Sequence, residues 1–300
     1  MKLVSFRGTD NTLRAGIVRS DSVIDISEAV AALRLPAERL EEMAQRGIPE
    51  PKDGMLRLLY AGEQALAGMA TAKGPALPLK GLTLLSPVPR PGKIVAVGRN
   101  YADHAKETGI DPFEKPRIIA KLPSSVIGPG AMVNRPASVT KLDFEAELGV
   151  VIGRPAANVP LSRALDVVAG YTALNDISAR EFQFDVSPPQ TTFAKSMDGF
   201  CPMGPYLVTR DEVPDVQALS VACFVNGERL QHGNTVQMIF SVARLIEYVS
   251  QFMTLEPGDV LATGTPAGVG AFRKPPLWLK PGDVVRVEIG GVGTLENTIG

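Results

Sequence analysis

The sequence contains few of the residues on which several classes of protein depend. Its 300 residues include only 2 cysteines, 2 histidines and 1 tryptophan. Cys201 and Cys223 are too few for a disulfide framework and form no Cys-x-x-Cys pair, so we expect both to be buried apolar residues. With only His104 and His232, a multi-histidine zinc site is excluded. Any metal site must therefore use mainly oxygen ligands, as sites for magnesium, manganese and calcium do.

Long apolar runs and clusters of basic residues are also missing. No stretch reaches the length of a membrane span, and the first ten residues lack the apolar segment of a secretory signal. The formal net charge of −1, without a basic cluster, argues against a nucleic-acid partner. Because disulfides are not expected, we predict a cytoplasmic protein with neither a membrane nor a nucleic acid as partner.

The spacing of apolar residues divides the chain into two expected domains. Residues 1–80 are predicted to form a small α+β domain, with short strands first and helical spacing between about residues 37 and 68. A stretch rich in proline and glycine then places the boundary near residue 80. Residues 81–300 consist mainly of short strands, with a hairpin signal at Asn226-Gly227 and one clear helix within 241–255. The predicted fold class is therefore α+β and β-rich, with a rolled or barrel-like second domain.

A group of acidic residues leads into one predicted strand. Glu145 and Glu147 are two residues apart, so strand geometry directs both side chains to one face, with Cα atoms about 7 Å apart. Asp176 ends an apolar stretch, where an unpaired buried carboxylate would be costly. Three carboxylates tied to strands are typical of a site for a hard divalent cation. Spacing alone leaves a solvated acidic face as an equally good interpretation.

Four separated motifs resemble the fumarylacetoacetate hydrolase family. In chain order they are DFEAELGVVIG, GYTALNDISAREFQ, FAKSMDGFCPMGP and GDVLATGTPAGVG. Upstream of them, GRNYADHAKE resembles the acylpyruvase branch of that family. The resemblance covers about residue 84 to the C-terminus, and residues 1–80 resemble only loosely the N-terminal domain of longer members.

This resemblance implies a fold, a metal and a class of substrate. The implied fold is a mixed β-roll that forms a homodimer. The implied metal ligands are Glu145, Glu147 and Asp176, which would hold magnesium or manganese, with calcium as a further option. The implied substrate is a small 2-oxo acid or diketo acid, whose carboxylate and keto oxygens chelate the metal.

His104 and Glu107 are candidates for moving a proton. They stand at i and i+3 on a predicted helix and so share one face. A carboxylate that holds one ring nitrogen leaves the other free to take a proton from water. From the residues alone, an ordinary pair on a surface helix is the alternative, whereas the resemblance identifies them as the water-activating dyad. His232 has no carboxylate neighbour in the sequence, and we expect a surface or loop histidine.

The resemblance also assigns roles to residues that spacing leaves ambiguous. Lys195, which from sequence is equally well a charge at a strand edge, is assigned to stabilising an oxyanion or enolate. Arg180 and Gln183 match substrate-contacting positions, where an arginine suits a carboxylate. Thr265 matches another such position, with a plain turn before Pro266 as its alternative. Lys121 is expected to lie outside the cleft, at the end of its strand.

Together these residues predict a metal-dependent enzyme. Cleavage of a C–C bond in a 1,3-dicarbonyl needs activated water, a stabilised oxyanion and a carbon that leaves as an enolate, which a divalent cation assists as a Lewis acid. We therefore expect hydrolysis of an acylpyruvate, a fumarylpyruvate-like acid or another 2,4-dioxo acid, including those from sugar breakdown. The same site also supports decarboxylation of oxaloacetate or another β-keto acid, and keto–enol isomerisation. A catalytically idle metal-binding interaction module is a third hypothesis.

Overall fold

The computed structural model describes residues 1–109 and 111–300. The strands are β1 (Lys2–Arg7), β2 (Leu13–Arg19), β3 (Ser22–Asp25), β4 (Ala76–Pro78), β5 (Leu84–Leu85), β6 (Ile94–Gly98), β7 (Arg117–Lys121), β8 (Val126–Ile127), β9 (Leu142–Asp143), β10 (Ala146–Ile152), β11 (Val168–Asn175), β12 (Ser178–Ala179), β13 (Cys201–Thr209), β14 (Ser220–Val225), β15 (Glu228–Asn234), β16 (Val260–Ala262), β17 (Val284–Ile289) and β18 (Gly293–Thr298). The α-helices are α1 (Ser27–Ala31), α2 (Ala37–Gln45), α3 (Gly54–Ala61), α4 (Glu63–Gly68), α5 (Ala102–Glu107), α6 (Arg180–Phe184), α7 (Thr191–Ala194) and α8 (Val242–Ser250).

One large mixed sheet organises the molecule. Its strands follow the order β4-β3-β2-β1-β13-β11-β10-β16-β6-β7, and β5 and β8 pair with β1 and β13. Most neighbours are antiparallel, whereas β16 with β6 and β13 with β8 are parallel. Every residue of β10 and β11 is buried, as expected for central strands covered on both faces. The prediction of a β-rich α+β fold is confirmed.

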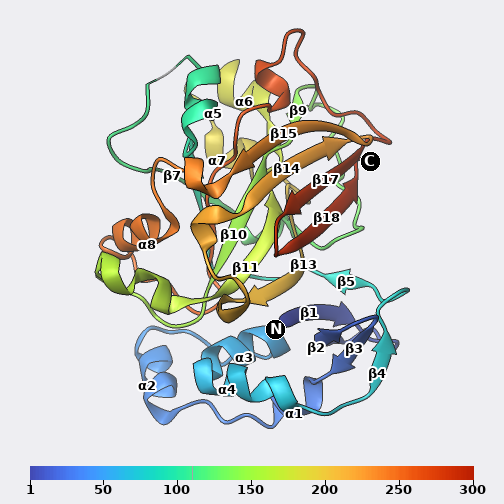
Figure 1. Ribbon diagram of the computed structural model, residues 1–300, viewed down its shortest axis with the longest axis vertical. Helices are drawn as coiled ribbons and strands as arrows, with labels where there is room; N and C mark the ends of the chain where they lie inside the picture. Colours follow the sequence, from blue (N-terminus) through green and yellow to red (C-terminus); the bar gives the residue numbers. More distant parts are fainter. Residues whose placement is uncertain (110) are drawn as a thin grey trace.

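A second sheet covers one face of the first. It has the order β15-β14-β17-β18, and its apolar side chains share one core with those of β10 and β11 (Figure 1). The predicted hairpin joins β14 to β15, with positive φ at both Asn226 and Gly227, as a type I′ turn requires. The predicted helix is α8, where the Ser241 side chain accepts a hydrogen bond from the Arg244 N–H.

Residues 1–80 lie at one end of the molecule, opposite α5, α6 and α7 (Figure 1). Their strands continue the large sheet, because β1 pairs with β13 in the register Leu3 to Leu207. The stretch rich in proline and glycine contributes β4 and β5 to the same sheet. The boundary near residue 80 stays a prediction. Within the described residues, each helix is too short or too polar to cross a lipid bilayer.

Candidate metal centre and active site

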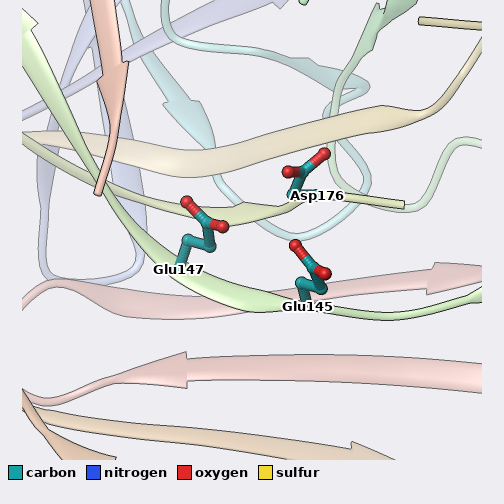
Figure 2. A group of neighbouring side chains, drawn as sticks. All are labelled: Glu145, Glu147 and Asp176. Carbon is teal, nitrogen blue, oxygen red and sulfur yellow. The ribbon is translucent and has the colours of Figure 1, made fainter. Parts of the chain in front are cut away.

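Antiparallel pairing of β10 with β11 brings three carboxylates together. The Asp176 N–H donates to the Glu145 carbonyl at 2.9 Å, so the end of β11 lies beside the start of β10. Glu147 follows two residues later and is 2% exposed. One carboxylate oxygen from each of the three residues lies within 4.8 Å of the others. Figure 2 shows the three carboxylates turned toward a common centre. Their role as metal ligands stays a prediction.

Two buried lysines contact this group of three carboxylates. Lys195 Nζ donates to Glu145 Oε2 at 2.8 Å, to Asp176 Oδ2 at 2.6 Å and to Ser178 Oγ at 2.8 Å. Lys121 Nζ donates to Asp176 Oδ1 at 2.6 Å and to the carbonyls of Lys195 and Phe200. An ammonium group has three donors. Both lysines therefore use all their donors on the protein and contribute charge to the site.

Arg180 ties the acidic group to the loop after β16. Its Nη2 donates to Glu145 Oε1 at 2.6 Å and its Nε to Asp143 Oδ2 at 2.8 Å. Asp143 is fully buried and also accepts the N–H groups of Gly270 and Ala271. A Cβ at position 270 would lie 2.6 Å from Asp143 Oδ1, so this close approach requires glycine. Nη1 donates to Gln183 Oε1 at 2.9 Å, so each nitrogen of the guanidinium forms one hydrogen bond.

The group contains one more acidic than basic side chain. Its buried charged residues are Asp143, Glu145, Glu147, Asp176, Lys121, Arg180 and Lys195. The imbalance falls on Glu147, whose pKa is raised well above its usual value by burial and then by repulsion from Asp176 and Glu145. Burial also acts to raise the pKa of Glu145, but Lys195 and Arg180 outweigh it and lower that pKa. A hard divalent cation, which prefers oxygen ligands, would supply the missing positive charge, so the residues present fit such an ion.

The two residues of the predicted dyad are in contact. His104 Nδ1 lies 2.6 Å from Glu107 Oε1, and Glu107 Oε2 accepts the Gly268 N–H at 2.9 Å. His104 is 5% exposed, and the Phe272 ring lies edge-on to it at 6.1 Å. No described residue forms a hydrogen bond with Nε2 of His104. That nitrogen is therefore free to exchange a proton with a bound molecule.

A cavity of about 230 Å³ brings most of the predicted residues together. It is lined by the three carboxylates and by His104, Arg180, Gln183, Lys195 and Thr265. Thr265 Oγ1 donates to the Ala146 carbonyl, which fixes it beside the start of β10. The roles of Arg180, Gln183 and Thr265 in binding a substrate stay predictions.

Two arginines of the cavity were missed, and one residue makes a contact that was not foreseen. Lys121 ends β7 and is not among the described residues that line the cavity, as expected, but its side chain turns inward and contacts Asp176. His232 is exposed, as expected, and lies in β15. Arg99 and Arg117 also line the cavity, although neither was assigned a role, and Arg99 stands in the motif GRNYADHAKE. Separately, both cysteines are buried as predicted.

Known proteins of one family are similar to this chain. The family model described as "Fumarylacetoacetate (FAA) hydrolase C-terminal" matches residues 93–300. A human protein, oxaloacetate tautomerase FAHD2A, mitochondrial, is 45% identical over 82% of this chain and 79% of its own length. The fumarylacetoacetate hydrolase from Exiguobacterium antarcticum is 37% identical, with a TM-score of 0.79 over 100% of this chain and 99% of that one.

A third similar protein carries a metal. The maleylpyruvate hydrolase from Sphingobium sp. SYK-6, solved with manganese(II) and pyruvate, is 29% identical to this chain. The TM-score is 0.77, over 100% of this chain and 98% of that chain. The expected homodimer and cytoplasmic location stay predictions.

Proposed function

This chain belongs to the fumarylacetoacetate hydrolase family, and on that premise we propose that it interconverts the keto and enol forms of an oxaloacetate-type 2-oxo acid. One observation carries the proposal: His104, which is held by Glu107, lines the same cavity as the three carboxylates. The activity of the human relative, an oxaloacetate tautomerase, supports tautomerisation as the principal reaction.

In this mechanism Glu145, Glu147 and Asp176 would hold manganese or magnesium. The bound ion would supply a Lewis acid for the keto and carboxylate oxygens of the substrate. His104 takes a proton through Nε2 from the carbon between the two carbonyl groups, because Nδ1 is held by Glu107. The electron pair of the broken C–H bond moves into the enolate, and the proton is then delivered to its oxygen.

Other residues of the chain assist this proton transfer. Glu107 accepts two hydrogen bonds, one from the ring and one from Gly268, so it orients His104 and stabilises the ring when it is charged. Lys195 places a positive charge at the cavity wall, where negative charge develops on the substrate oxygen. Gln183 and Thr265 also line this cavity and would contact the substrate there.

Hydrolysis of a C–C bond in an acylpyruvate is the second candidate. The same pair would then take a proton from water, which attacks the acyl carbonyl while the pyruvate end leaves as an enolate. Similarity to the maleylpyruvate hydrolase favours this reaction. Decarboxylation of oxaloacetate uses the same enolate chemistry but needs no base, so His104 distinguishes it from the other two.

The test uses the manganese-loaded full-length chain. Oxaloacetate tautomerisation is followed through the ultraviolet absorbance of the enol, and acetylpyruvate cleavage and oxaloacetate decarboxylation are assayed in parallel. We expect His104→Asn to lower kcat for tautomerisation about 10²- to 10⁴-fold, the usual contribution of a general base. Manganese affinity and decarboxylation should stay near wild-type values.

The matched control is His232→Asn, which changes the exposed histidine in β15 and should leave all three rates unchanged. Tautomerisation at the wild-type rate in His104→Asn would remove this histidine from the mechanism. Wild-type protein that turns over none of the three substrates would instead favour the interaction module without catalysis.

A further inference from the structure

Strand β7 leads from the carboxylate cluster to the far wall of the cavity. Arg117 begins this strand and Lys121 ends it, and residues two apart on a strand share a face. Arg117, Ile119 and Lys121 therefore face the same side, and the first two line the cavity. Lys121 contacts Asp176 at the cluster. At about 3.3 Å per residue, the Cα of Arg117 lies ~13 Å from that of Lys121.

A second arginine stands beside Arg117. Gly98 of β6 pairs with Arg117 of β7, and Arg99 is the next residue in the chain after Gly98. Arg99 has a φ of 56°, in the left-handed region that residues other than glycine rarely adopt. Its guanidinium lies 5.5 Å from the centre of the Phe113 ring, and it too lines the cavity. The two arginines thus lie together on one wall.

This pair lacks a counterion among residues 1–109 and 111–300. Within that part of the chain neither guanidinium forms a side-chain hydrogen bond or an ion pair, whereas Arg180 holds two carboxylates. Burial and then repulsion from Arg117 lower the pKa of Arg99. Two adjacent cations on a cavity wall without an acidic partner form a receptor for an anion.

We propose that Arg99 and Arg117 bind a second carboxylate of the substrate, which makes the enzyme selective for dicarboxylic 2-oxo acids. The inference rests on the proposed function, which places the 2-oxo acid end of the substrate at the carboxylate cluster. The length of β7 between Arg117 and Lys121 leaves room for dicarboxylates longer than oxaloacetate. Selectivity arises because an arginine fork binds a carboxylate through paired, charge-assisted hydrogen bonds that a methyl group cannot replace.

The test compares two unreactive ligands of equal length on the manganese-loaded full-length chain. These are 2-oxoadipate, which has a distal carboxylate, and 2-oxohexanoate, which ends in a methyl group. Isothermal titration calorimetry should show 2-oxoadipate binding at least tenfold more tightly to the wild type. Arg117→Gln and Arg99→Gln should each weaken 2-oxoadipate severalfold, and the double variant should abolish the preference while leaving 2-oxohexanoate within twofold.

Arg229→Gln is the matched control, because this arginine is exposed near the start of β15, in the second sheet and not in the sheet that contains β6 and β7. Equal affinity of the two ligands for the wild type, or an equal loss of both in the variants, would overturn the carboxylate subsite. If oxaloacetate turnover is intact in either case, the proposed function stands without the subsite. Absence of turnover and of metal-dependent binding of both ligands would overturn the two proposals together.

Discussion

Replacing Glu147 by glutamine is expected to stabilise the metal-free protein and to weaken its binding of a divalent cation. Glu147 is buried, its pKa is raised by burial and by Asp176 and Glu145, and one of its oxygens accepts the Gly264 N–H. A glutamine keeps an oxygen for that N–H and gains an amide donor for the neighbouring carboxylates. Removing the uncompensated acid should raise the free energy of unfolding by about 1–3 kcal/mol.

The control is the same substitution two residues earlier. Glu145 accepts hydrogen bonds from Arg180 and Lys195, and these cations lower its pKa although burial opposes them. Glu145→Gln leaves two buried cations with one less anion, which should cost about 3–5 kcal/mol of stability. Both substitutions remove a proposed metal ligand. Each should therefore lower manganese affinity by more than the roughly 10- to 100-fold lost with an outer-shell partner.

Urea denaturation at pH 7 with a chelator gives the two stabilities, and calorimetric titration with manganese gives the two affinities. We expect Glu147→Gln to raise the free energy of unfolding and Glu145→Gln to lower it. Both substitutions should lower the affinity for manganese. If Glu147→Gln destabilises the metal-free protein as much as Glu145→Gln does, the proposed imbalance of charge is refuted. If Glu147→Gln stabilises it but binds manganese normally, the imbalance is real and the ligand assignment is wrong.

Three further substitutions test the same physical picture. Lys121→Met should lower the free energy of unfolding by about 3–5 kcal/mol, because Asp176 and two carbonyls lose a buried donor. Arg180→Lys should cost about 2 kcal/mol, because a lysine keeps the charge but lacks the planar fork whose separate nitrogens reach Asp143 and Glu145. Asp259→Asn tests pH dependence: burial, partly offset by Lys93, raises the pKa of Asp259 from 3.8 to about 6. A raised acid pKa favours the folded state at low pH, so the wild type should lose about 3 kcal/mol relative to the variant between pH 4 and pH 7. Urea denaturation measures all three.

Each of these outcomes has a clear opposite. A Lys121→Met protein as stable as the wild type would show that its contact with Asp176 contributes nothing net. An Arg180→Lys protein with unchanged stability would show that charge alone suffices there. A stability difference for Asp259→Asn that does not change with pH would mean that this carboxyl titrates alike in the folded and unfolded chain.

The sequence predicted the parts of the site that depend on local spacing. Glu145 and Glu147 are two residues apart at the start of β10, and their carboxylates come together. His104 and Glu107 are three residues apart on a helix, and their side chains touch at 2.6 Å. Asp176 was assigned to the same site as Glu145 and Glu147 because a buried acidic residue at the end of an apolar strand needs a partner. Local periodicity also predicted that residues 81–300 consist mainly of short strands, which is why the fold class could be assigned before any pairing was known.

Contacts that depend on which face of a strand is buried were not predictable. In the sequence Arg-Ile-Ile-Ala-Lys of β7, Ile118 and Ile119 are equally apolar, so alternation cannot decide whether Lys121 turns toward the core or the solvent. The structure buries Ile119 and Lys121 and exposes Ile118. Only the position of β7 beside β6, at the edge of the large sheet, selects this face.

The distribution of charge explains why the acidic cluster and the arginine wall belong to one site. The buried acidic cluster contains four carboxylates and three cations. Its net charge is therefore negative and repels an anionic 2-oxo acid. A divalent cation at the proposed ligands would make the net charge of this cluster positive, so that the cluster attracts the 2-oxo acid end of the substrate. Arg99 and Arg117 attract an anion whether or not the acidic cluster holds a metal. These two arginines can therefore bind a dicarboxylate first, whereas a monocarboxylate depends on the metal alone. This difference is the physical basis of the proposed selectivity.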